Sequence, residues 1–184
     1  RPPRAGGWLH EIKFDGYRTQ LHLHAAKPKA FTRRGNDWSK RFTDPLAEEL
    51  ETLDLYLSIM RARFADRLQV DVSVEDGAQN ARVPPLVLQP LVENAILHGD
   101  PGPGAAARIG IRARRDNGRL LLEVEDNGPG LAGPPDEAAG RGIGLGTTAR
   151  RLEQLYGARA GVTLENLPGG GVRAVITLPF ESST

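Results

Sequence analysis

The hydrophobic periodicity of this 184-residue chain changes near residue 46, and that change limits the folds open to it. Before it, residues 8–14 and 17–25 read as two strands, with a third candidate strand at 29–33. From Leu46 onward, apolar residues recur at helical spacing as far as residue 64. We therefore expect a short β-meander, with no second layer to cover it, followed by an amphipathic helix.

The later elements predict a two-layer α/β fold. A strand at 68–74 precedes a helix that Pro84 and Pro85 open and Gly99 ends. Strand, strand, glycine-rich loop, helix, strand and strand then follow at about 106–114, 118–125, 128–144, 144–156, 161–166 and 172–178. This order predicts an α/β sandwich in which helices cover one face of a mixed sheet.

Composition excludes several classes of site. The chain has no cysteine, which rules out disulfides, zinc–thiolate sites and thiol catalysis. No apolar run approaches the ~18 residues that span a bilayer, and the start of the chain lacks the core of a signal peptide. We therefore expect a soluble protein without a membrane segment in this chain, and the lack of cysteine fits a cytoplasmic location.

The charge is divided unevenly along the chain. All four lysines lie within the first 40 residues, and residues 1–43 hold ten basic and three acidic side chains, a net charge of +7. The remaining residues hold 14 basic and 20 acidic side chains, a net charge of −6. A basic arm of this kind is consistent with nucleic-acid binding, and equally with a solvated, lysine-bearing surface.

Two polar motifs suit nucleotide binding. Asn94 lies on the inward face of the helix expected at 84–98, where its amide oxygen can ligate Mg²⁺ without adding charge beside a phosphate. Asp126 ends an apolar strand, and its carboxylate can accept a hydrogen bond from an adenine amino group, while Gly128 and Gly130 let the backbone approach the base. Taken alone, the asparagine also fits a local helix bond and the aspartate a plain turn.

The third motif is the glycine run that ends the loop. Gly140, Gly142 and Gly144 precede a helix, so backbone N–H groups there can face phosphate oxygens. The run follows a loop rather than a strand and lacks a βαβ frame, which argues against a dinucleotide-binding fold.

In this order and at these distances, the motifs resemble those of the GHKL superfamily. The stretch VPPLVLQPLVENAILHG at 83–99 is similar to the LytS-like sensor histidine kinases, and YLSIMRARF at 56–64 resembles their connecting helix. The resemblance covers about residues 45–184. It implies a Bergerat-type two-layer α/β sandwich that binds ATP, with a connecting helix at 44–66 and the ATP-binding domain at 67–184.

The resemblance also implies a role for each motif. Asn94 would hold Mg²⁺, Asp126 would read the adenine, and a mobile lid at about 128–143 would cover the phosphates. The other nucleotide contacts that we expect are Gly128 and Gly130 at the base, Gly142, Gly144 and Leu145 at the phosphates, Thr177 through a water to the adenine, and His98 by helix packing or phosphate contact.

The likeness bears on the reaction as well. In the ATPase branches of the superfamily, a glutamate four residues before the metal-binding asparagine activates water, and here that position is Pro90. Glu93 is adjacent to Asn94 and so points about 100° away from it on a helix. The expected reaction is therefore phosphotransfer to a histidine supplied elsewhere, with a histidine-bearing dimerisation domain and a response regulator as partners.

Two helices carry expectations about the surface. In the family the 46–64 helix continues into a dimerising bundle, so Leu50, Leu53 and Leu57 are expected to be exposed and to drive self-association. Arg150 and Arg151 are expected on a solvated helix face, with phosphate contact as the alternative.

Residues 1–43 carry a second resemblance. Their K-x-D-G-x-R motif at 13–18, with the flanking segments at 8–12 and 32–42, is similar to the ATP-dependent DNA ligases of bacterial end joining. The later motifs of that family require lysines, and no lysine follows residue 40. We therefore expect an incomplete adenylation fragment.

The ligase likeness implies roles for three residues. Lys13 would be the nucleophile that attacks the α-phosphate of ATP, Glu11 would lie beside the adenine, and Arg18 would contact ribose or phosphate. Ligation through Lys13, and nucleic-acid binding through the basic arm, thus stand as alternatives to the kinase-type function.

Overall fold

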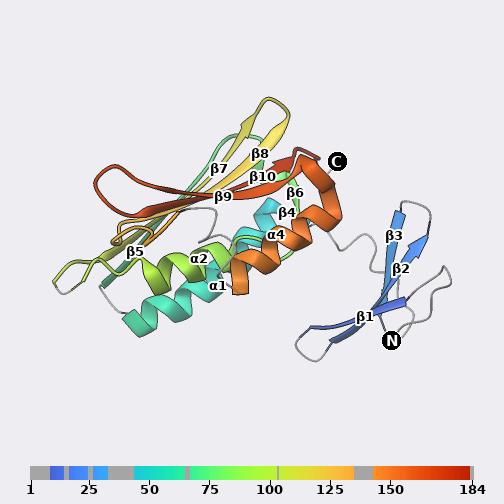
Figure 1. Cartoon of the computed structure of the whole chain (residues 1–184), viewed down its shortest axis with the longest axis horizontal. Coiled ribbons are helices and arrows are strands. Elements are labelled where there is room, and N and C mark those ends of the chain that lie inside the picture. The colour runs from blue at the N-terminus through green and yellow to red at the C-terminus, as the bar shows by residue number, and fades with distance from the viewer. Residues whose placement is uncertain are drawn as a thin grey trace. The chain divides into compact units, whose positions relative to one another are not determined.

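The computed structural model describes residues 9–14, 17–24, 27–32, 44–64, 67–102, 104–134 and 143–182. The chain divides into two compact units, residues 1–43 and residues 44–184 (Figure 1).

The first unit contains a three-stranded antiparallel sheet in the order β1-β2-β3. Its strands are β1 (Leu9–Phe14), β2 (Tyr17–His24) and β3 (Lys27–Thr32). In the β1–β2 register, Lys13 pairs with Arg18, and Glu11 pairs with Gln20. The predicted meander is confirmed.

The second unit is a five-stranded mixed sheet with helices on one face (Figure 1). The strand order is β5-β7-β8-β10-β9, in which only the β5–β7 pair is parallel. The strands are β5 (Leu68–Val74), β7 (Ala107–Asp116), β8 (Arg119–Asp126), β9 (Gly161–Asn166) and β10 (Val172–Pro179), and the helices are α1 (Leu46–Phe64), α2 (Gln89–His98) and α4 (Ile143–Tyr156). The predicted two-layer α/β sandwich is confirmed.

Short elements tie the start of α1 to the rest of this unit. Strand β4 (Asp44–Pro45) pairs with β6 (Arg82–Val83), and the Leu46 N–H donates to the carbonyl of Ala81. The part of the chain that the structure describes also contains the 3₁₀ turns η3 (Ala78–Asn80) and η4 (Gly157–Arg159). The first residue of α1, Leu46, is fully buried in the core as a result.

Helix α1 turns its regularly spaced leucines inward, which corrects one expectation. Leu53 and Leu57 are 3% and 1% exposed, and Leu50 is partly buried against the same core. They cover the sheet and are not available for association, because this apolar face of the helix packs against the core that the later strands supply. No helix of the described residues is long and apolar enough to cross a bilayer.

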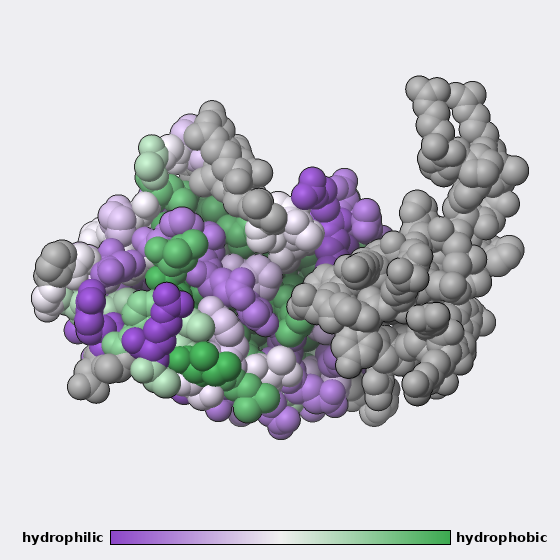
Figure 2. Space-filling model, turned by 90° about the horizontal axis from the view of Figure 1, so that it is seen from below, coloured by the Kyte–Doolittle hydropathy of each residue, from purple (hydrophilic) through white to green (hydrophobic). Residues whose placement is uncertain are grey.

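Apolar side chains other than these three leucines are exposed on the helical layer. Seen from the helical side, apolar patches interrupt the polar surface (Figure 2). The large side chains concerned are Leu55 and Ile59 of α1 and Leu97 of α2. The apolar surface of α1 thus consists of Leu55 and Ile59 rather than the three leucines expected.

Helix α2 begins later than its two prolines indicate. It starts at Gln89, and residues 84–88 form turns that include Leu86 with a φ of 56°. A left-handed residue cannot belong to a right-handed helix, so the helix can begin only after it. Pro90, in the first turn, takes the position that was expected for Pro84 and Pro85.

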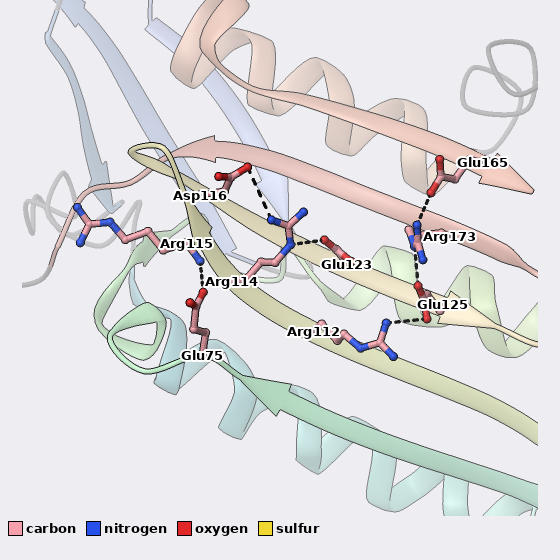
Figure 3. Close-up of polar contacts among 9 residues, drawn as sticks. All are labelled: Glu75, Arg112, Arg114, Arg115, Asp116, Glu123, Glu125, Glu165 and Arg173. Carbon is pink, nitrogen blue, oxygen red and sulfur yellow. Dashed lines mark hydrogen bonds and ion pairs between the residues drawn. The ribbon is translucent and has the colours of Figure 1, made fainter. Parts of the chain in front are cut away.

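The sheet face away from the helices carries alternating charges (Figure 3). Arg173 of β10 lies between Glu125 of β8 and Glu165 of β9, with N–O distances of 2.5 and 2.6 Å. Arg114 of β7 donates to Glu123 of β8 at 2.9 Å. These cross-strand pairs follow the register of the sheet, and partly exposed pairs of this kind contribute modestly to stability.

The orientation of α1 can be tested by two leucine substitutions. Leu53→Ala should lower the free energy of unfolding by about 2–5 kcal/mol, because it opens a cavity in the core. Leu55→Ala, at a position that is 71% exposed, should change it by less than about 0.5 kcal/mol. Urea denaturation of both variants measures the difference, and equal losses would contradict the orientation described.

Candidate functional site

Asp126, at the end of β8, is held by backbone bonds on one of its two oxygens. Its Oδ1 accepts the N–H groups of Gly128 at 2.9 Å and Val172 at 3.3 Å. Among the described residues, no donor bonds Oδ2. The carboxylate is therefore fixed in orientation with one oxygen left to accept a hydrogen bond from a ligand.

Burial raises the pKa of the Asp126 carboxyl above its ordinary value of 3.8. The N–H bonds from Gly128 and Val172 and the charge of His98 oppose the rise. His98 is exposed at the last position of α2, so the helix end contributes to the electrostatics around this carboxylate.

Glycines allow the end of α2 to pack against the strand exit that follows Asp126. A Cβ on Gly128 would lie 2.6 Å from the Cα of Gly99, and a Cβ on Gly99 would lie 2.7 Å from the Cβ of Asp126. Real Cβ atoms do not come this close to other atoms. The Asp126 carboxylate is therefore positioned by direct backbone contact with the helix.

The β9–β10 turn packs against the same segment. Gly171 has a φ of +93°, and a Cβ there would collide with the carbonyl oxygen of Asp126. Gly130 has a φ of +88°, and its neighbour Leu131 donates its N–H to Asn166 Oδ1 at 2.7 Å. The glycines after Asp126 therefore meet the α2 end on one side and the β9–β10 hairpin on the other.

Helix α2 connects this region to the start of α4. Gly144 lies beside Pro90, and a Cβ on Gly144 would be 3.7 Å from the Pro90 Cβ. Asn94 is one turn after Pro90 and His98 one turn further, so all three share a face of the helix. The Asp126 end and the Gly144 end are separated by about 12 Å along the helix, with Asn94 between them.

At the start of α4, the backbone rather than the side chains is available to a ligand. Leu145 is 2% exposed, with its side chain in the core, and Thr148 donates back to the Gly144 carbonyl at 3.0 Å. Gly144 itself is exposed. Gly142 and the part of the expected lid at 135–142 lie outside the described residues.

The side-chain amide of Asn94 is available to bind a ligand. Its side chain is half-buried, and among the described residues nothing hydrogen-bonds it. The described residues contain no group of three His, Asp or Glu side chains that could hold a metal ion alone. An amide oxygen combined with phosphate oxygens and waters fits Mg²⁺, which is usually bound in this way.

Some expected residues do not join this arrangement. Thr177 pairs with Leu121 in mid-strand, whereas Asp126 extends the set of Leu120, Leu122 and Val124 on the helical face. Side chains alternate along a strand, so Thr177 lies on the opposite face of the sheet from Asp126. The ligase-type residues Glu11, Lys13 and Arg18 belong to the other unit.

The solvated position expected for Arg151 is wrong. Its guanidinium is partly buried and donates to the Pro85 carbonyl at 2.7 Å. Burial lowers its pKa, and the negative charge of Glu49 opposes that effect. Arg150, its neighbour, is exposed as expected.

Sequence reasoning missed the residues that position the site without forming it. Gly99 was assigned only to ending α2, and Gly171 was given no role in the site. A signal was present, because Gly99 directly follows the predicted contact His98 and Gly128 is itself a predicted contact. The sequence alone does not show that Gly99 and Gly128 come into contact in the folded chain.

The glycine contact predicts a specific sensitivity. Gly128→Ala should lower the free energy of unfolding by roughly 1–3 kcal/mol, because the added methyl group would press against the Gly99 backbone. Gly133→Ala is the matched control, since nothing lies within 4 Å of a Cβ there. Thermal unfolding of both variants measures the effect, and a tolerant Gly128 would contradict the packing.

Asp126 should also make the free energy of unfolding depend on pH. Because its pKa is raised on folding, the folded protein holds this proton more tightly than the unfolded chain. Stability from this group should therefore fall as pH rises from about 4 through the raised value. Asp126→Asn lacks the titration, so the unfolding free energy of the wild type minus that of the variant should decrease from pH 4 to 7 in urea titrations; a constant or rising difference would contradict this.

The sequence matches a known family over the part that forms the site. Residues 79–182 match the model of the histidine kinase-, DNA gyrase B-, and HSP90-like ATPases. This range includes α2, the end of β8, the start of α4 and the β9–β10 turn. The comparisons lend no support to the DNA-ligase resemblance of residues 1–43.

Individual relatives are sensor kinases. The sensor histidine kinase BtsS of Escherichia coli K12 is 38% identical over 135 residues, which cover 73% of this chain and 24% of BtsS. YesM of Bacillus subtilis is 34% identical over 150 residues, 81% of this chain and 26% of YesM. The chain thus spans about a quarter of the length of these relatives.

Solved structures share the fold. The catalytic domain of the histidine kinase ThkA superposes with a TM-score of 0.61 at 18% identity, covering 77% of this chain and 97% of that domain. The Acinetobacter baumannii histidine kinase AdeS gives a TM-score of 0.59 at 16% identity, covering 76% of this chain and 67% of AdeS. The family match over residues 79–182 shows that the chain belongs to the histidine kinase-, DNA gyrase B-, and HSP90-like ATPases.

Proposed function

We propose that residues 44–184 bind Mg·ATP along α2 and present its terminal phosphate to a histidine on another segment or chain. The observation that carries this proposal is the order of groups along one helix face. Asp126, with a free carboxylate oxygen, lies at one end of α2, the exposed start of α4 lies at the other, and Asn94 is between them.

Each group suits one part of the nucleotide. Oδ2 of Asp126 accepts the adenine amino group, and the glycines at 128 and 130 let the backbone turn away from the strand beside the base. The backbone N–H of Gly144, in the first turn of α4, faces the phosphates. Gly142 lies outside the described residues and is expected to contact the phosphates as well. Asn94 is the protein ligand for Mg²⁺, which neutralises phosphate charge when bound.

The residues of α2 favour phosphotransfer over hydrolysis of ATP. Pro90, one turn before Asn94, has no group that can take a proton. Glu93 is exposed and accepts a hydrogen bond from Gln89 at 2.7 Å, so its carboxylate is engaged along the helix. The reaction that remains is transfer to an external histidine, which in turn requires a histidine-bearing domain as partner.

The partner that follows in the reaction is a response regulator. The histidine kinase ThkA, which shares this fold with a TM-score of 0.57 and 19% identity, has been solved in complex with the response regulator protein TrrA. We place the same exchange in the proposed function of this chain, on the cytoplasmic side, where ATP is supplied.

The nucleotide site can be tested by calorimetric titration of Mg·ATP. Asp126→Asn should weaken binding by tenfold or more, on the order of one charged hydrogen bond, because its amide group would meet the adenine amino group as a second donor. Asn94→Ala should reduce the dependence of affinity on Mg²⁺.

Lys13→Ala serves as the control in the same titrations. It lies in the other unit and should bind Mg·ATP as the wild type does. Binding that survives Asp126→Asn and disappears with Lys13→Ala would overturn the proposal in favour of an adenylating site.

A further inference from the structure

Glu49 of α1 is a buried carboxylate that holds the turn before α2. It is 4% exposed, and its two oxygens accept the N–H groups of Leu86 at 2.6 Å and Leu88 at 2.9 Å. An ionised side chain is rarely buried to this extent unless it is fully hydrogen-bonded. Glu49 is therefore bonded to a segment 37–39 residues away in the sequence.

The turn that Glu49 holds contains a left-handed leucine and lacks a side-chain cap. Leu86 is in the left-handed region, with a φ of 56°, which costs a non-glycine residue about 1–2 kcal/mol. Leu88 is the N-cap of α2 and has no side chain that can cap the helix. The Glu49 carboxylate accepts the N–H of the N-cap residue, as the glutamate of a capping box does, and places a negative charge at the helix start.

Arg151 of α4 holds the same turn from its carbonyl side. Its guanidinium donates to the Pro85 carbonyl at 2.7 Å. Burial raises the pKa of the Glu49 carboxyl, and the N–H groups of Leu88, Leu86 and Val87 and the charge of Arg151 oppose this rise. Three elements thus meet at residues 84–88: α1 through Glu49, α4 through Arg151, and the start of α2.

Two of the three elements, α2 and α4, contribute to the proposed nucleotide site. Helix α2 carries Asn94 six residues after its N-cap, and the first turn of α4 contains Gly144, the proposed phosphate contact. A shift of the 84–88 turn would move Asn94 relative to the start of α4. The hydrogen bonds of Glu49 on α1 therefore affect how Asn94 is aligned with the backbone at the start of α4.

We propose that Glu49 is a positioning residue for the nucleotide site, which makes Mg·ATP affinity depend on the placement of α1. This inference rests on the proposed function and extends it to a helix that touches no nucleotide. Through linkage, bound nucleotide favours the same placement of α1 that favours nucleotide binding.

The test compares Glu49→Gln with Glu48→Gln. Glutamine keeps one acceptor oxygen and sets an NH₂ group against the second N–H of the turn, whereas Glu48 is an exposed neighbour on the same helix. In Glu49→Gln, Mg·ATP affinity by calorimetry should fall on the order of tenfold, and amide exchange at Leu86 and Leu88 should accelerate. Glu48→Gln should match the wild type in both.

These readouts separate positioning from a general loss of stability. A folded Glu49→Gln protein that exchanges faster at Leu86 and Leu88 yet binds Mg·ATP like the wild type overturns the inference. A wild type that binds no Mg·ATP overturns the proposed function and the coupling with it, while the exchange data still report the role of Glu49 in the turn.

Arg151→Gln keeps the inference testable should Glu49→Gln not fold. It removes the bond to Pro85 and leaves the two Glu49 bonds in place, and Mg·ATP affinity should again fall. If both residues act through one turn, the double variant should lose less affinity than the sum of the single losses. Unchanged affinity in Arg151→Gln, or strictly additive losses, would overturn the inference.

Discussion

The site depends on close backbone approach at the exit of β8. Gly128 lies against Gly99 at the end of α2, and Gly171 lies against the Asp126 carbonyl. With side chains at these positions, the helix and the β9–β10 hairpin would be forced away from the strand. This packing places the end of α2 beside Asp126, and helix geometry then sets Asn94 between Asp126 and the start of α4, ~12 Å along the helix.

The opposite end of α2 is controlled in a different way. There the backbone is held by side chains, with Glu49 accepting N–H groups and Arg151 donating to a carbonyl of the 84–88 turn. One end of the helix is therefore fixed by steric contact and the other by buried charge. Steric packing tolerates little movement, whereas a charged contact between separate helices can respond to displacement of α1.

The sequence was sufficient to predict the fold of this unit, because alternating strands and regularly spaced leucines predicted every long element. The family resemblance placed Asn94, Asp126 and Gly144 in one motif set, and their roles in nucleotide binding stay predictions. The start of α2 was misplaced because proline position alone does not reveal a left-handed Leu86. The leucines of α1 were expected outside because periodicity defines a face without saying what covers it.

Residues that act across the fold were the hardest to predict. From the sequence, Glu49 has no assigned role and Arg151 is expected on a solvated face, because the partners of these two residues lie 37 and 66 residues away. Thr177 was placed near the adenine from its strand, and only the register with β8 shows that it lies on the other face of the sheet.

Binding of the nucleotide along α2 is tested most directly by NMR of the chain titrated with Mn·ATP. Paramagnetic broadening should be strongest at Asn94 and at the start of α4; broadening centred on residues 1–43, or spread evenly over the chain, would contradict it.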